Sequence, residues 1–135
     1  MPAGRSALLL EAPLTTLPAE GGLMMRCDSV AFPPGGCAYT HTHQGPGTRC
    51  LREGAIRIDT DGTSHHYAPG EAWFEAGPVP VFARADADVP SRFIRAMVLP
   101  RRLLGQSSIA YVNPEDADKP KTQTYRVWVD REIEL

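Results

Sequence analysis

The chain has 135 residues, which is enough for one domain with a single core and leaves no room for a second. Its 14 Lys and Arg and 16 Asp and Glu residues are scattered and give a net charge of -2, so there is no basic stripe to bind nucleic acid. No apolar run approaches the roughly 20 residues that span a bilayer, and the short run Ala7–Leu10 ends at Glu11. We therefore expect a cytoplasmic protein with no nucleic-acid or membrane partner.

Glycine and proline interrupt nearly every stretch of the sequence. The chain contains 12 Gly and 13 Pro beside 42% hydrophobic residues, a combination typical of short strands joined by tight turns and unlike a disordered chain. The three cysteines Cys27, Cys37 and Cys50 are an odd number with no C-x-x-C pair. We expect them to be reduced and buried, with no structural zinc site.

Strand-like segments fill most of the chain between these turns. In order they are Leu23–Phe32, Cys37–His43, Thr48–Arg52, Ala55–Asp59, Ser64–Tyr67, Ala72–Glu75, Val81–Ala83, Arg92–Leu99 and Thr124–Val129. The dipeptide Asp61-Gly62 between two short strands predicts a tight hairpin turn. Only Arg101–Leu104 and Pro114–Asp118 favour a helical turn.

The number and spacing of these strands predict an all-β antiparallel fold, a sandwich or small barrel, in place of a parallel α/β sheet. We interpret residues 1–135 as one domain, with the barrel core at about 23–100. The N-terminal segment and residues 101–135, which hold the late strand, are interpreted as arms that pack on the barrel or on a partner.

The strongest chemical signal is the pair His41 and His43. Two histidines separated by one residue on a strand point to the same face, so both imidazoles can reach one metal ion. The alternative interpretation is two polar residues beside a turn.

The surroundings of the pair resemble the cupin family. The first cupin motif combines a glycine, a His-x-His pair, a glutamate and a second glycine, and it is approached by Gly35 or Gly36, His41, His43 and Gly54. The turns of the second motif are approached by Pro69-Gly70 and Gly77-Pro78. The resemblance spans about residues 30–100 and implies a small cupin-like jelly-roll barrel with a metal site inside.

Two of the four ligands that the resemblance implies are missing. The family's glutamate falls on Gly47, and its last histidine falls on Pro80. Glu75, at the end of the segment Ala72–Glu75, is a candidate replacement, because two histidines and one carboxylate form the facial triad of non-haem iron oxygenases. The alternative for Glu75 is an exposed acid or a partner of an arginine.

Strand alternation adds three candidate ligand-binding residues. Arg49 shares the inward face of Gly47 and needs a carboxylate partner, either Glu75 or an anionic ligand; its alternative position is at the barrel mouth in contact with solvent. Tyr39 shares the parity of the two histidines and could offer its hydroxyl to a ligand, and Trp73 shares the parity of Glu75 and could form an aromatic wall. We expect His65 and His66 to be exposed, not ligands.

Together these residues predict a small cupin-type protein whose His41, His43 and Glu75 hold a divalent metal ion, iron, nickel, zinc or manganese. The favoured function is a metal-dependent dioxygenase acting on a small carboxylate substrate, with isomerase or lyase chemistry behind it. The alternative is a non-catalytic small-molecule-binding barrel without metal. The resemblance also implies a homodimer, and the late strand is suited to an exposed sheet edge.

Overall fold

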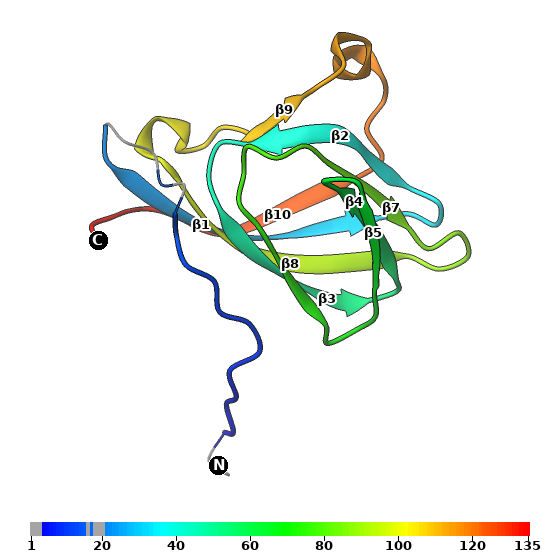
Figure 1. Ribbon diagram of the computed structural model, residues 1–135, viewed down its shortest axis with the longest axis horizontal. Coiled ribbons are helices and arrows are strands. Elements are labelled where there is room, and N and C mark those ends of the chain that lie inside the picture. The colour runs from blue at the N-terminus through cyan, green and yellow to red at the C-terminus, as the bar shows by residue number, and fades with distance from the viewer. Residues whose placement is uncertain (1–3, 16, 18–20) are drawn as a thin grey trace.

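The computed structural model describes residues 4–15, 17 and 21–135. Its strands form two antiparallel five-stranded sheets that enclose a common interior (Figure 1). The strands are β1 (Leu23–Phe32), β2 (Cys37–His43), β3 (Gly47–Glu53), β4 (Ile56–Thr60), β5 (Thr63–Tyr67), β6 (Ala72–Glu75), β7 (Val81–Ala85), β8 (Ser91–Pro100), β9 (Ile109–Tyr111) and β10 (Thr124–Ile133). One sheet has the order β10-β1-β8-β3-β6 and the other β5-β4-β7-β2-β9, so the predicted all-β class is confirmed.

All nine predicted strands are present, and the prediction missed β9. This strand has three residues, which is too short to show alternation, and it is defined by its pairing with β2. The two helical turns are the 3-10 segments Arg101–Leu103 and Pro114–Asp118. None of the described helical segments has the length and hydropathy needed to cross a membrane.

The predicted hairpin joins β4 to β5. Asp61 and Gly62 both adopt positive φ, 50° and 73°, as a type I′ turn requires. This turn sets the pairing of Thr60 with Thr63 and fixes the register of both strands.

The barrel interior is built from rows of side chains that lie opposite one another on neighbouring strands. Leu51, Phe93 and Val30 form one row on β3, β8 and β1, within the main apolar core. One inward position further along the same strands, the row is Arg49, Arg95 and Asp28. The same sheet therefore changes from an apolar to a charged interior within two residues.

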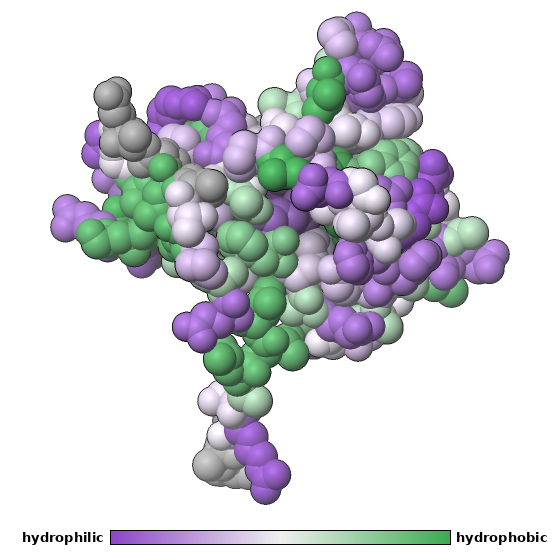
Figure 2. Space-filling view, viewed as in Figure 1, coloured by the Kyte–Doolittle hydropathy of each residue, from purple (hydrophilic) through white to green (hydrophobic). Residues whose placement is uncertain are grey.

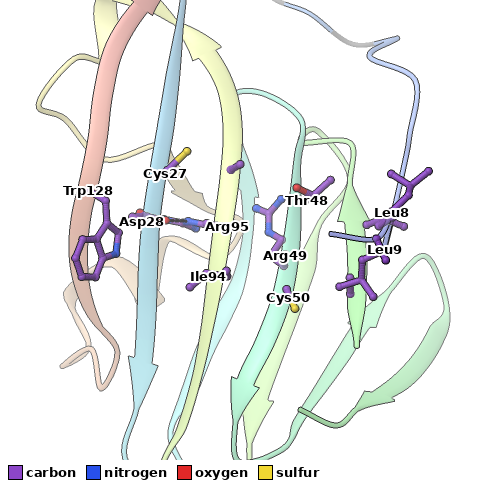
Figure 3. A pocket seen from close by; sticks show the side chains of 14 residues that line it. Leu8, Leu9, Cys27, Asp28, Thr48, Arg49, Cys50, Ile94, Arg95 and Trp128 are labelled. Atoms are coloured by element: carbon purple, nitrogen blue, oxygen red, sulfur yellow. Dashed lines mark hydrogen bonds and ion pairs between the residues drawn. The ribbon is translucent and has the colours of Figure 1, made fainter. Parts of the chain in front are cut away.

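The outer face of this sheet is apolar in places. The N-terminal arm brings Leu8 and Leu9 against it, over a cavity of about 400 Å3 that also contacts Ile94 on β8 and Trp128 on β10 (Figure 3). Figure 2 shows apolar residues gathered along this arm. Trp128 remains 56% exposed, so the arm covers the face only in part.

The three cysteines are free, as predicted, but they are half-buried where the prediction had them buried. Cys27 and Cys50 contact the cavity on the outer face of the sheet. The reason is that the inward positions of their strands are taken by Asp28 and Arg49, their chain neighbours.

Candidate metal centre

Three side chains with metal-binding donor atoms meet inside the barrel. His41 and His43 extend from β2 and Glu75 from the end of β6, and all three are at most 9% exposed. One donor atom of each lies within 4.8 Å of those of the other two. The residues singled out from the sequence as a possible triad are therefore brought together, and they lie where bulk solvent does not compete for a bound ion.

A β-bulge in β2 determines which side chains of that strand face the triad. Ala38 pairs with Ala83 and His41 with Val81, so β2 advances three residues while β7 advances two. The inward positions are consequently Ala38, His41 and His43.

Tyr39 does not share the face of the histidines, contrary to the prediction from strand parity that it lines the cavity. Its ring lies near the Lys119 and Lys121 ammonium groups, at 5.0 and 5.6 Å from the ring centroid. The bulge changes the phase of the strand between Ala38 and His41, which alternation counted back from the histidines cannot reveal. Tyr39 contributes through its backbone carbonyl instead.

Both histidines are oriented through their Nδ1 atoms. His41 Nδ1 lies 2.6 Å from the carbonyl oxygen of Tyr39, and since a carbonyl can only accept, this nitrogen carries the proton. His43 Nδ1 lies 3.1 Å from Ser108 Oγ, a side chain that is itself buried. The Nε2 atom of His41 is thereby left with its lone pair free for a metal ion.

Burial keeps both imidazoles neutral. It lowers the pKa of His41, partly offset by the Tyr39 carbonyl and by Glu75. It lowers the pKa of His43 further, well below the ordinary value, and the cations Arg49 and Arg95 add to the effect. Neutral imidazole is the form that binds a metal ion, so both side chains are in the protonation state that ligation requires.

Glu75 divides its two oxygens between two roles. Oε2 accepts a hydrogen bond from Trp73 Nε1 at 2.8 Å and an ion pair from Arg49 Nε at 3.2 Å. Oε1 is buried, has no hydrogen-bond partner among the described residues, and lies 4.0 Å from His43 Nε2. The sequence left open whether Glu75 is a metal ligand or the partner of Arg49. The pairing with Arg49 is present and uses Oε2, so Oε1 is left available as a metal ligand.

Arg49 is turned into the barrel, as alternation predicted, and is 2% exposed. It donates from Nη1 to the carbonyl of Gly47 at 2.9 Å in addition to its contact with Glu75. Burial lowers its pKa, and the charge of Glu75 opposes that shift. Trp73, expected to form an aromatic wall, is 4% exposed and stacks on Tyr67 at 4.6 Å between ring centroids.

Gly47, where the cupin pattern would have its glutamate, lies directly opposite Glu75 in the β3–β6 pairing. A Cβ atom at Gly47 would meet the backbone oxygen of Ala96 and Cγ of Met97, each at 2.6 Å. There is no room for a side chain at this point of β3, and the neighbouring strand supplies the carboxylate at the same level. Pro80, at the position of the missing histidine, is exposed, and its carbonyl accepts a hydrogen bond from Thr60.

Some residues of the site were not predicted. Ser108, which precedes β9, forms a hydrogen bond with His43. Arg95 and Asp28 form a buried ion pair at 2.7 Å beside Arg49. Alternation within the correctly predicted strands β1 and β8 could have identified Arg95 and Asp28 as inward. Ser108 carries no such signal, because its contact depends on a loop. His65 and His66 are exposed on β5, as expected.

No family model matches the sequence, and no curated protein is similar to it. Similarity appears among solved structures. An RmlC-like cupin from Shewanella frigidimarina superposes with a TM-score of 0.51 at 19% identity, covering 64% of this chain and 84% of that one. The DMSP lyase DddQ from Ruegeria pomeroyi gives a TM-score of 0.55 at 18% identity over 71% of this chain and 46% of its own.

A third structure, of a protein from Thermus thermophilus, gives a TM-score of 0.51 at 22% identity and covers 70% of this chain and 90% of that one. These similarities show the cupin-like jelly-roll fold that the sequence motifs implied. Identities this low say nothing about activity, and less than half of the lyase chain is matched.

Proposed function

We propose that His41, His43 and Glu75 hold a divalent metal ion, and that this ion is the centre of a small cupin-type enzyme. The observation that supports the proposal most directly is Glu75 Oε1, a buried carboxylate oxygen that lacks a hydrogen-bond partner among the described residues and lies beside two neutral imidazoles. An isolated buried oxygen of this kind is costly. A cation at this position would satisfy it.

The ligand set favours oxygenase chemistry over the alternatives. Two histidines and one carboxylate leave coordination positions open on a metal ion. A metal such as iron, when bound, would supply either the activation of dioxygen or Lewis-acid chemistry. The chain itself fixes the imidazoles through Tyr39 and Ser108 and fixes the carboxylate through Trp73 and Arg49. Isomerase or lyase chemistry, which uses the same Lewis-acid property, is the second candidate after dioxygenase chemistry.

The metal content of the purified protein tests this proposal. Protein prepared without a histidine tag should carry roughly one metal ion per chain, and the His41→Gln/His43→Gln variant should carry none. The matched control is His65→Gln/His66→Gln, which removes two exposed histidines from β5 and should retain the metal.

The same experiment separates the enzyme from a metal-free binding barrel. If the wild-type protein contains no metal and takes up neither iron, nickel, zinc nor manganese on addition, the proposal is wrong and the non-catalytic alternative replaces it. If metal is retained by the His41→Gln/His43→Gln variant, the ion binds elsewhere, and this triad is not its site.

A further inference from the structure

A second cavity, of about 410 Å3, lies on the inner side of the β10-β1-β8 part of the first sheet. The segment Gly105–Ile109 contributes to its wall, and the surface that the wall presents is mainly apolar although seven of the eleven lining residues are polar or charged. Tyr125 and Val127 of β10 contact it and are about half exposed, at 48% and 52%. An apolar cavity of about 150 Å3 already accommodates a benzene ring, so a small organic molecule fits here.

This cavity adjoins the metal triad. Ser108 is part of its wall, and the Oγ atom of Ser108 lies 3.1 Å from His43 Nδ1. Arg95, also in its wall, lies directly opposite Arg49 in the pairing of β8 with β3. A molecule bound in the cavity would therefore lie next to the residues that position the triad.

The cations in the wall are already neutralised. Arg95 donates from Nε and Nη2 to the two oxygens of Asp28, at 2.7 and 3.0 Å. Arg26 donates from Nε and Nη2 to Asp130, at 3.1 and 3.3 Å. Arg49, for which the sequence left Glu75 or an anionic ligand as the partner, is paired with Glu75. Arginine and carboxylate are thus matched one to one along this side of the barrel.

A ligand with a net negative charge would find no unpaired cation in this wall and would lose its hydration on entering. A neutral carbonyl oxygen has a use here, because the bonds to Asp28 engage Nε and Nη2 of Arg95 and no described residue accepts a hydrogen bond from its Nη1. From this pairing and the apolar walls we infer that the cavity binds an uncharged, largely apolar molecule with a carbonyl-type acceptor. The inference rests on the proposed function in so far as this molecule would be the substrate of the metal centre.

Benzamide and benzoate test the inference, because the two have nearly the same size and differ in charge at neutral pH. Titration followed by NMR should show benzamide binding at least about tenfold more tightly than benzoate, since the charged probe loses its hydration without a partner. Equal or tighter binding of benzoate to the wild-type protein would overturn the inference.

Two variants locate the probe and test the role of charge. Val127→Trp, which fills the cavity from the edge strand, should abolish benzamide binding, whereas the control Val129→Trp on the same strand should not. Asp130→Asn leaves Arg26 without its carboxylate and should shift the preference toward benzoate. Unchanged benzamide binding in Val127→Trp, or an unchanged preference in Asp130→Asn, would each contradict the inference.

Repeating the titration with the His41→Gln/His43→Gln variant separates this inference from the proposed function. A benzamide preference that persists without metal supports the cavity, whether or not the wild-type protein contains an ion. Benzoate binding that appears only when the histidines are intact would instead indicate a carboxylate at the metal, which overturns this inference and supports the metal centre.

Discussion

The two ends of the barrel interior are formed by the same strands but differ in polarity, one being apolar and the other charged. The row Leu51, Phe93 and Val30 is apolar and packs as an ordinary core. The next inward row, Arg49, Arg95 and Asp28, is as deeply buried but charged throughout. Burying charge is expensive even when each ion has a partner, so the charged row stabilises the fold far less than an apolar row in its place would. The charged row lies beside the triad, so the part of the barrel that is costly to bury is also the part where we propose the metal site.

The largest effect should come from breaking one ion pair of the charged row. In metal-free protein, Arg49→Met leaves the Glu75 carboxylate buried with only Trp73 as a hydrogen-bond partner, and we expect a loss of about 3–5 kcal/mol in the free energy of unfolding, measured by urea denaturation in the presence of a chelator. The double variant Arg49→Met/Glu75→Met should recover most of this loss. If the single variant loses less than about 1 kcal/mol, the comparison of the two rows is wrong.

A cavity at the apolar end should cost somewhat less and leave the site intact. Leu51 is fully buried, and Leu51→Ala should lower the free energy of unfolding by about 3 kcal/mol without changing the metal content of the folded protein. Loss of metal together with stability would mean that the two rows do not act independently.

A smaller effect is expected from removing the hydroxyl that orients His43. Ser108→Ala should weaken metal affinity by about 10- to 100-fold, as measured by competition with a chelator. Ser107→Ala, at an exposed neighbouring serine, is the matched control and should leave the affinity unchanged. Equal affinities in the two variants would show that the bond to His43 has no influence on the metal.

The smallest effect on folding concerns the outer face of the sheet. We predict that two copies pair there, because Trp128 and Ile94 expose apolar surface on this face and an exposed apolar patch is typical of an interface between subunits. Trp128→Ser should change the free energy of unfolding by no more than about 0.5 kcal/mol and yield a monomer in light scattering. Val127→Ser, facing the other side of β10, should remain a dimer; a wild-type monomer would contradict the prediction.

The fold was largely predictable because turn chemistry and alternation act locally. Gly or Pro lies within two residues of both ends of β1, β2 and β6, so the limits of these strands could be predicted without error. The inward position of Arg49 followed from alternation for the same reason. Both signals depend on neighbours in sequence alone.

The features that were mispredicted depend on contacts between distant segments. The bulge that turns Tyr39 away exists only in the pairing of β2 with β7, and nothing in the sequence of β2 records it. The hydrogen bond between Ser108 and His43 joins residues 65 positions apart. The contact of Arg49 with only one of the two Glu75 oxygens likewise depends on the register of β3 with β6, which the sequence does not give.

The close packing around Gly47 restricts how this sequence can change. The atom that blocks a side chain there is a backbone oxygen, that of Ala96, which no substitution can remove. Exchanging Glu75 and Gly47 in two mutational steps therefore cannot place a carboxylate on β3, although the two residues are opposite one another. A search that requires metal ligands in a fixed order along the chain would pass over such a protein, whereas a search by position across paired strands would find it.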